Sequence, residues 1–147
     1  MTYRAVLAAA ATAIALSGCG TSALSTPVLR TRATRICRLA STREQRIPTP
    51  TAPAGGAAFL SDGALVLRRE LRSLRGLDAG GRATAPYARA LRDLAAERSQ
   101  LEASAERLAH DADPVAEIRA LQTQLAALES DADDAWQRLG IPACTTR

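Results

Sequence analysis

The sequence predicts an all-α fold: an antiparallel four-helix bundle in up-down-up-down order, closed by one disulfide and preceded by a signal peptide. Three observations lead to this prediction. Four segments after residue 26 repeat apolar residues at alternating steps of three and four, which is the helical period. Alternation of period two, which would indicate strands, is absent over any useful length. Two cysteines lie near the two ends of this helical region.

Composition restricts the class of protein before any motif is considered. The 147 residues suffice for one domain, and 23% charged residues exclude a polytopic membrane protein. Only 3% are aromatic and one residue is histidine, so little material exists for metal sites, catalytic triads or base-stacking surfaces. The formal net charge is +4, with arginine supplying every basic side chain. We expect neither a cofactor nor enzymatic activity.

Residues 1–18 have the organisation of a signal peptide. Arg4 supplies a charged start, and residues 5–16 form an apolar run of about a dozen residues, as in the hydrophobic region of such signals. A membrane-spanning helix needs about 20 apolar residues, so this run is short for one. The rival interpretation keeps residues 5–16 as a transmembrane anchor.

The apolar run is followed at once by Leu16, Ser17, Gly18 and Cys19. This tetrapeptide resembles the lipobox of bacterial lipoproteins, which has a branched apolar residue, two small residues and then cysteine. The resemblance implies that a signal peptidase recognises Leu16, Ser17 and Gly18 and cuts before Cys19. It also implies acyl chains on Cys19 that hold the mature chain on the outer face of the cell membrane. Residues 19–26, rich in Ser, Thr and Gly, would be the lipidated tether, and 27–147 the bundle.

The first helix is predicted over 27–47 and the second over 57–77. Pro27 suits a first helical position, and Pro48 ends the first pattern. A proline-containing loop then leads to the second helix, whose apolar stripe is interrupted by Gly63.

The third helix is predicted to begin at Thr84, with a stripe that runs to Leu108. The fourth has the clearest local signals. Asp113 is a good N-cap, Pro114 suits the first helical position, and Gly140 fits the position just past the helix end. Trp136 lies beside the apolar stripe of this helix, where we expect it in the core.

The number of cysteines predicts one intramolecular disulfide. Export would place the domain in an oxidising compartment, and lipidation of Cys19 would leave Cys37 and Cys144 as an even pair. An up-down bundle brings the end of the fourth helix near the first, although the tail after Gly140 has to fold back. Two free buried thiols or an intermolecular bridge are the alternatives.

The cysteine positions carry a second, looser resemblance. Small helical lipoproteins of high-GC Gram-positive bacteria are similar in having one cysteine early in the first helix. They have another after a closing Leu-Gly-x-Pro stop, which here is Leu139 to Pro142 followed by Cys144. This resemblance implies shape and location and implies no activity.

Charge is unevenly distributed along the chain. Residues 30–46 contain six arginines and one glutamate, whereas 97–134 contain ten acidic residues and three arginines. We favour the interpretation that the first and fourth helices are neighbours with complementary charges. The alternative is a basic face toward anionic lipid headgroups and an acidic face toward a partner or cations. Nucleic-acid binding is not expected, because export separates the chain from nucleic acid and no aromatics accompany the arginines.

No constellation in the sequence indicates catalysis or metal binding. Asp131, Asp133 and Asp134 lack the alternating loop positions of a calcium site and are expected on a solvated helix face. His110 is expected at a helix end, and the chain has no second histidine to complete a metal site with it. Ser61 and Ser99 have no histidine at the spacing of a catalytic triad.

Two functions are therefore expected as alternatives. The first is a non-catalytic, membrane-anchored envelope protein that binds an unidentified protein partner through a helical face. The second is a carrier that holds a small apolar or cationic ligand between its helices. An internal cavity above about 300 Å³ would favour the carrier, and a filled core with exposed apolar residues would favour the partner.

Overall fold

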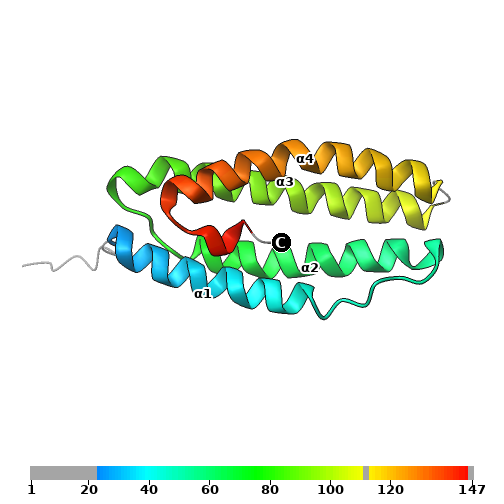
Figure 1. The fold of residues 1–147 in the computed structure, drawn as a ribbon, viewed down its shortest axis with the longest axis horizontal. Coiled ribbons are helices and arrows are strands. Elements are labelled where there is room, and N and C mark those ends of the chain that lie inside the picture. The colour runs from blue at the N-terminus through cyan, green and yellow to red at the C-terminus, as the bar shows by residue number, and fades with distance from the viewer. Residues whose placement is uncertain (1–22, 111–112, 146–147) are drawn as a thin grey trace, which may run out of the picture.

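A computed structural model describes residues 23–110 and 113–145 (Figure 1). Within these ranges the chain forms four α-helices and three single turns of 3-10 helix, with no β-strand. The prediction of an all-helical protein with four helices is confirmed. None of the described helices is long and apolar enough to cross a membrane. The predicted signal peptide, with Leu16, Ser17, Gly18 and Cys19, lies outside the described residues.

Helix α1 spans Thr26–Glu44 and is shorter than predicted at its C-terminal end. Residues 45–47 form a turn in which Arg46 and Ile47 donate backbone hydrogen bonds to the carbonyls three residues earlier. The physical reason is Pro48, whose ring disfavours the α conformation at the residue before it, so that the last turn tightens and the helix stops.

Helix α2 spans Gly56–Arg75, and α3 spans Thr84–Ala109. The turn η1 (Pro53–Gly55) precedes α2, and η2 (Gly81–Ala83) precedes α3. The chain before α1 is attached to the linker between α2 and α3. Leu24 donates its amide hydrogen to the carbonyl of Asp78 at 2.7 Å, so the start of the described chain lies beside this linker.

Helix α4 spans Pro114–Leu139, as its local signals predict. The Asp113 carboxylate accepts hydrogen bonds from the amides of Val115 and Ala116, which satisfies two donors at the helix start. Gly140 has φ +69°, the left-handed conformation that ends many helices. After it, the turn η3 (Pro142–Cys144) runs back along the molecule (Figure 1).

The main helix contacts run in chain order, α1 with α2, α2 with α3, and α3 with α4, while η3 contacts both α1 and α4. The larger core cluster joins all four helices and η3. Its largest fully buried apolar side chains are Trp136, Leu29, Leu71, Leu74, Leu94 and Ile141. The ring of Trp136 meets Tyr87 edge to face, with centroids 5.8 Å apart, so Trp136 lies in the core as predicted.

A second, smaller cluster lies toward the other end of the bundle. Its buried members are Leu60, Ala105 and Leu121, from α2, α3 and α4. Helix α1 has 19 residues, whereas α3 and α4 have 26 each. Because α1 stops early, this end of the bundle is built from three helices and the loop before α2 (Figure 1).

Candidate functional site

The two cysteines of the helical domain meet in the core. Cys37 comes from the middle of α1 and Cys144 from η3, with Cα atoms 5.1 Å apart across 107 residues of sequence. Both residues are almost completely buried. The prediction that the tail folds back to bring Cys144 to Cys37 is confirmed, and the fully buried Ile141 packs the returning segment into the core.

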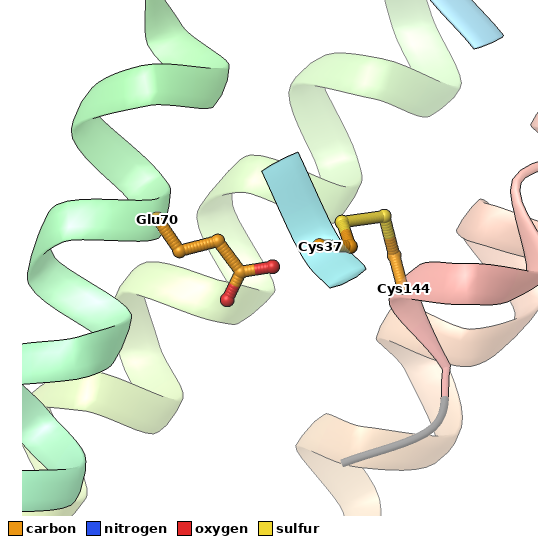
Figure 2. Close-up of side chains that lie close together, drawn as sticks. All are labelled: Cys37, Glu70 and Cys144. Atoms are coloured by element: carbon orange, nitrogen blue, oxygen red, sulfur yellow. A yellow bond between two sulfur atoms is a disulfide. The ribbon is translucent and has the colours of Figure 1, made fainter. Parts of the chain in front are cut away.

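A buried carboxylate faces this disulfide. Glu70 of α2 is 2% exposed, and one of its oxygens lies within 4.8 Å of both sulfur atoms (Figure 2). Sequence reasoning missed it, although a signal existed. Glu70 stands three residues after Leu67 and four before Leu74, which places it on the apolar stripe of α2. Glu97, 8% exposed on α3, occupies the same position between Leu94 and Leu101.

The chemistry of this cluster depends on the state of its sulfur atoms. Two thiolates and a carboxylate would form a ligand set that zinc accepts. In the disulfide, however, the sulfurs are bonded to each other and lack the thiolate charge that a metal ligand needs. The disulfide therefore links α1 to η3, with the Glu70 carboxylate of α2 beside it, and its sulfurs are not available as thiolate ligands.

A surface groove of about 620 Å³ with a mainly apolar lining lies at the three-helix end. It runs between the loop 49–53, the start of α2, the end of α3 and the start of α4. Its larger apolar side chains include Phe59, Leu108, Val115, Ile118, Pro50 and Pro53. Phe59 is 37% exposed and Val115 is 64% exposed, so both can be contacted from outside the molecule.

The groove exists because α1 ends before it reaches this part of the bundle. Leu108 and Ile118 belong both to the groove and to the smaller core cluster, which lacks a fourth covering helix. Arg119 and Gln122, both exposed on α4, also line it, so a basic and an amide side chain accompany the apolar surface. No sequence pattern predicted this groove, because it results from the unequal lengths of helices far apart in the chain.

An ion pair joins α3 to α4 close to the groove. Arg107 donates two hydrogen bonds to the carboxylate of Glu117, at 2.9 and 2.7 Å. These bonds, with a further hydrogen bond that involves Ser104, lower the pKa of Glu117 from its usual 4.5 to about 2. The hydrogen bond to Glu117 likewise raises the pKa of Arg107. The pair remains ionised at neutral pH and fixes the start of α4 against the end of α3.

The predicted complementarity between the first and fourth helices is wrong. Among the described residues, no ion pair joins an arginine of α1 to a carboxylate of α4. Instead, Asp131 and Glu117 of α4 pair with Arg89 and Arg107 of α3. The physical reason is the packing order, in which α4 lies against α3 and η3 fills the space between α4 and α1.

The remaining polar candidates are dispersed. Asp131 contacts Arg89, whereas Asp134 lies 3.5 Å from Arg138 and Asp133 lines a small hollow beside Cys144. Their side chains thus face different neighbours and do not converge on one point. His110 caps the end of α3, as predicted, and its Nε2 lies 2.9 Å from the carboxylate of Glu106.

Comparison of the chain with protein-family models, curated proteins and solved structures finds no match. The candidate sites described above are therefore defined by their own geometry. They are the buried cluster of Cys37, Glu70 and Cys144, and the apolar groove at the three-helix end.

Proposed function

We propose that this chain is a membrane-anchored extracytoplasmic lipoprotein without catalytic activity, whose helical domain binds an envelope protein. In this proposal the helices form an up-down-up-down bundle that the Cys37–Cys144 disulfide closes. The observation that carries the binding role is the open apolar groove lined by Phe59, Leu108, Val115 and Ile118.

Support for the anchor comes from residues 1–19. The short apolar run and the tetrapeptide that ends in Cys19 together form the pattern of a lipoprotein signal. More than one acyl chain is needed for stable anchoring, because a single chain binds a membrane only marginally. A disulfide in the domain agrees with an oxidising, extracytoplasmic location.

Support for the binding role comes from the position and lining of the groove. The start of α1, where the tether would arrive, lies at the other end of the bundle from the groove (Figure 1). A partner could thus bind without displacing the anchor. Apolar surface flanked by Arg119 fits a segment that carries aliphatic or aromatic side chains next to an acidic residue.

The anchor is tested by metabolic labelling with a fatty acid. Cys19→Ser should abolish the label, because it removes the thiol that receives the lipid. Cys37→Ser leaves the tetrapeptide intact and should keep the label. Retention of the label in Cys19→Ser would refute lipidation at this residue.

The binding role is tested by a photo-reactive benzoylphenylalanine placed at Phe59 in intact cells, with Gln124 as the control position on the exposed face of α4. The expected result is one defined protein adduct from position 59 and none from position 124. Val115→Arg, an exposed substitution in the groove, should suppress the adduct without unfolding the domain. Equal adducts from both positions would contradict a groove-specific partner.

A small-ligand carrier is the second candidate, because the volume of the groove falls within the range of small-molecule sites. Native mass spectrometry of the protein isolated from cells distinguishes the carrier function from the protein-binding function. A bound molecule of constant mass, lost on denaturation and in Val115→Arg, would favour the carrier over the protein partner.

A further inference from the structure

Helix α1 presents a basic face that lies exposed in the described part of the chain. Its buried side consists of Leu29, Ala33, Cys37 and Ala40. On the opposite side, steps of four and three connect a stripe of exposed residues that continues into the turn after the helix. These residues are Val28, Arg32, Arg35, Leu39, Thr42 and Arg46.

The charge of this face is of one sign. Arg38 and Arg43 lie beside the stripe and are also exposed, whereas Glu44 is the only acidic residue of the helix. Three carboxylates of α4 pair with α3 or with α4 itself, in Asp131–Arg89, Glu117–Arg107 and Asp134–Arg138. Among the described residues, no ion pair joins an α1 arginine to a carboxylate of α4, and the arginines of the stripe lie exposed.

Apolar side chains interrupt the arginines on this face. Val28 is 41% exposed and Leu39 is 49% exposed, and both lie on the stripe with Arg32 and Arg35. Arginines next to exposed aliphatic residues suit the boundary between phosphate headgroups and acyl chains. There, guanidinium groups bind phosphate while small apolar side chains lose water contact.

The position of the helix in the chain also fits a membrane surface. Seven residue steps separate Cys19 from Thr26, which span at most about 25 Å when fully extended. An anchor at Cys19 would therefore hold the start of α1 within that distance of the headgroups. This step rests on the proposed lipidation; the charge and exposure of the face do not.

We propose that the exposed face of α1 binds an anionic lipid surface, so that the bundle lies with α1 against the membrane. The arginines contact the headgroup phosphates, and Val28 and Leu39 enter the interfacial layer. The groove at the three-helix end and the outer surface of α4 stay accessible to a partner. The local concentration of anionic lipid then determines how the bundle is oriented on the membrane. The tether alone does not fix this orientation.

The experiment uses the full chain with Cys19→Ser, so that lipidation plays no part. Binding is measured by sedimentation with vesicles of phosphatidylcholine alone and of phosphatidylcholine mixed with phosphatidylglycerol. Residues 1–18, including Arg4, are the same in every variant, so differences between variants isolate the contribution of the substituted arginines. We expect tighter binding to the anionic vesicles and loss of this preference at high salt.

The matched variants remove the same charge from different faces. Arg32→Gln with Arg35→Gln and Arg38→Gln should reduce the preference for anionic vesicles by roughly fivefold per arginine, on the order of a hundredfold in total. The control triple, Arg92→Gln with Arg119→Gln and Arg138→Gln on α3 and α4, should retain most of it. Circular dichroism verifies that both variants keep their helix content.

Equal losses in the two triple variants would overturn the proposal, because the attraction would then depend on net charge and not on the α1 face. Equal affinity of the Cys19→Ser protein, with all its arginines, for the two kinds of vesicle would also overturn the proposal. That result would favour an acidic protein as the partner of this face. Hydrogen exchange gives the orientation: anionic vesicles should slow exchange in exposed regions of α1 and leave α4 unchanged. These outcomes are independent of the labelling test at Cys19, so failure of lipidation and failure of this surface can be told apart.

Discussion

Arg30 Nε donates a hydrogen bond to the carbonyl oxygen of Leu139 across 2.6 Å, which ties the start of α1 to the end of α4. The guanidinium meets the helix at its C-terminal end, where the helix dipole places partial negative charge. The Arg30 side chain also limits which residue can follow Leu139, because a Cβ added at Gly140 would lie 2.9 Å from Arg30 Nε.

This arrangement predicts coupling between Arg30 and Gly140. Gly140→Ala should cost about 2 kcal/mol of the free energy of unfolding, since the left-handed φ and the contact with Arg30 both oppose a Cβ. In an Arg30→Ala background the contact disappears and the cost should fall to about 1 kcal/mol. Urea unfolding of the two single variants and the double variant measures both values. Strictly additive costs would show that the guanidinium does not restrict this position.

Loss of the disulfide should destabilise the domain by about 2–5 kcal/mol, because the bond joins residues 107 positions apart and restricts the unfolded chain. The variant to compare is Cys37→Ser with Cys144→Ser. A reducing agent should lower the unfolding midpoint of the native protein and leave that of the double variant unchanged. Non-reducing peptide mapping should recover Cys37 linked to Cys144, whereas two alkylatable thiols would contradict the bond.

Acid should weaken the contact between α3 and α4 through Glu117. Its folded pKa of about 2 lies below the usual 4.5, so the unfolded state binds more protons as pH falls. The stabilisation is therefore complete above pH 4.5 and is lost between about 4.5 and 2. Glu117→Gln should flatten the decline of the unfolding midpoint over this interval. Glu129→Gln, an exposed carboxylate on the same helix, is the control and should keep the native decline.

Trp136 should be the most sensitive single position of the core. It is completely buried and packs edge-on against Tyr87, so Trp136→Ala should cost about 3–5 kcal/mol. Tyr87→Phe removes only the hydroxyl that donates to the carbonyl of Leu74 at 2.8 Å, and should cost about 1 kcal/mol. Thermal and urea unfolding compare the two. A larger loss for Tyr87→Phe than for Trp136→Ala would contradict this order.

Gly63→Ala should stabilise the protein by up to about 1 kcal/mol, because alanine is a better helix former than glycine in the interior of α2. A Cβ at this position would lie 3.7 Å from Leu101 Cδ1, an ordinary van der Waals distance. An increase in the urea midpoint measures the effect. A decrease would show that α2 and α3 pack more closely here than this distance indicates.

The helices themselves were predictable where local chemistry sets their limits. The Asp113 cap, Pro114 and Gly140 define α4 to the residue, since capping hydrogen bonds and a left-handed glycine depend only on nearby positions. The end of α1 was placed three residues too late, at Ile47, because apolar spacing alone does not register the effect of Pro48 on the residue before it.

The sequence by itself predicted four helices and a pairing of Cys37 with Cys144, and it contains the pattern that indicates a lipid anchor at Cys19. Tertiary structure decided that Glu70 faces the disulfide, that α4 pairs its carboxylates with α3, and that a groove opens where α1 stops. The physical reason is the range of the interactions. Helical period, caps and cysteine number are properties of neighbouring residues or of simple counting. Contacts between helices depend instead on the relative lengths of the helices and on the path of the C-terminal tail. Here the tail places η3 beside α1, where the fourth helix was expected.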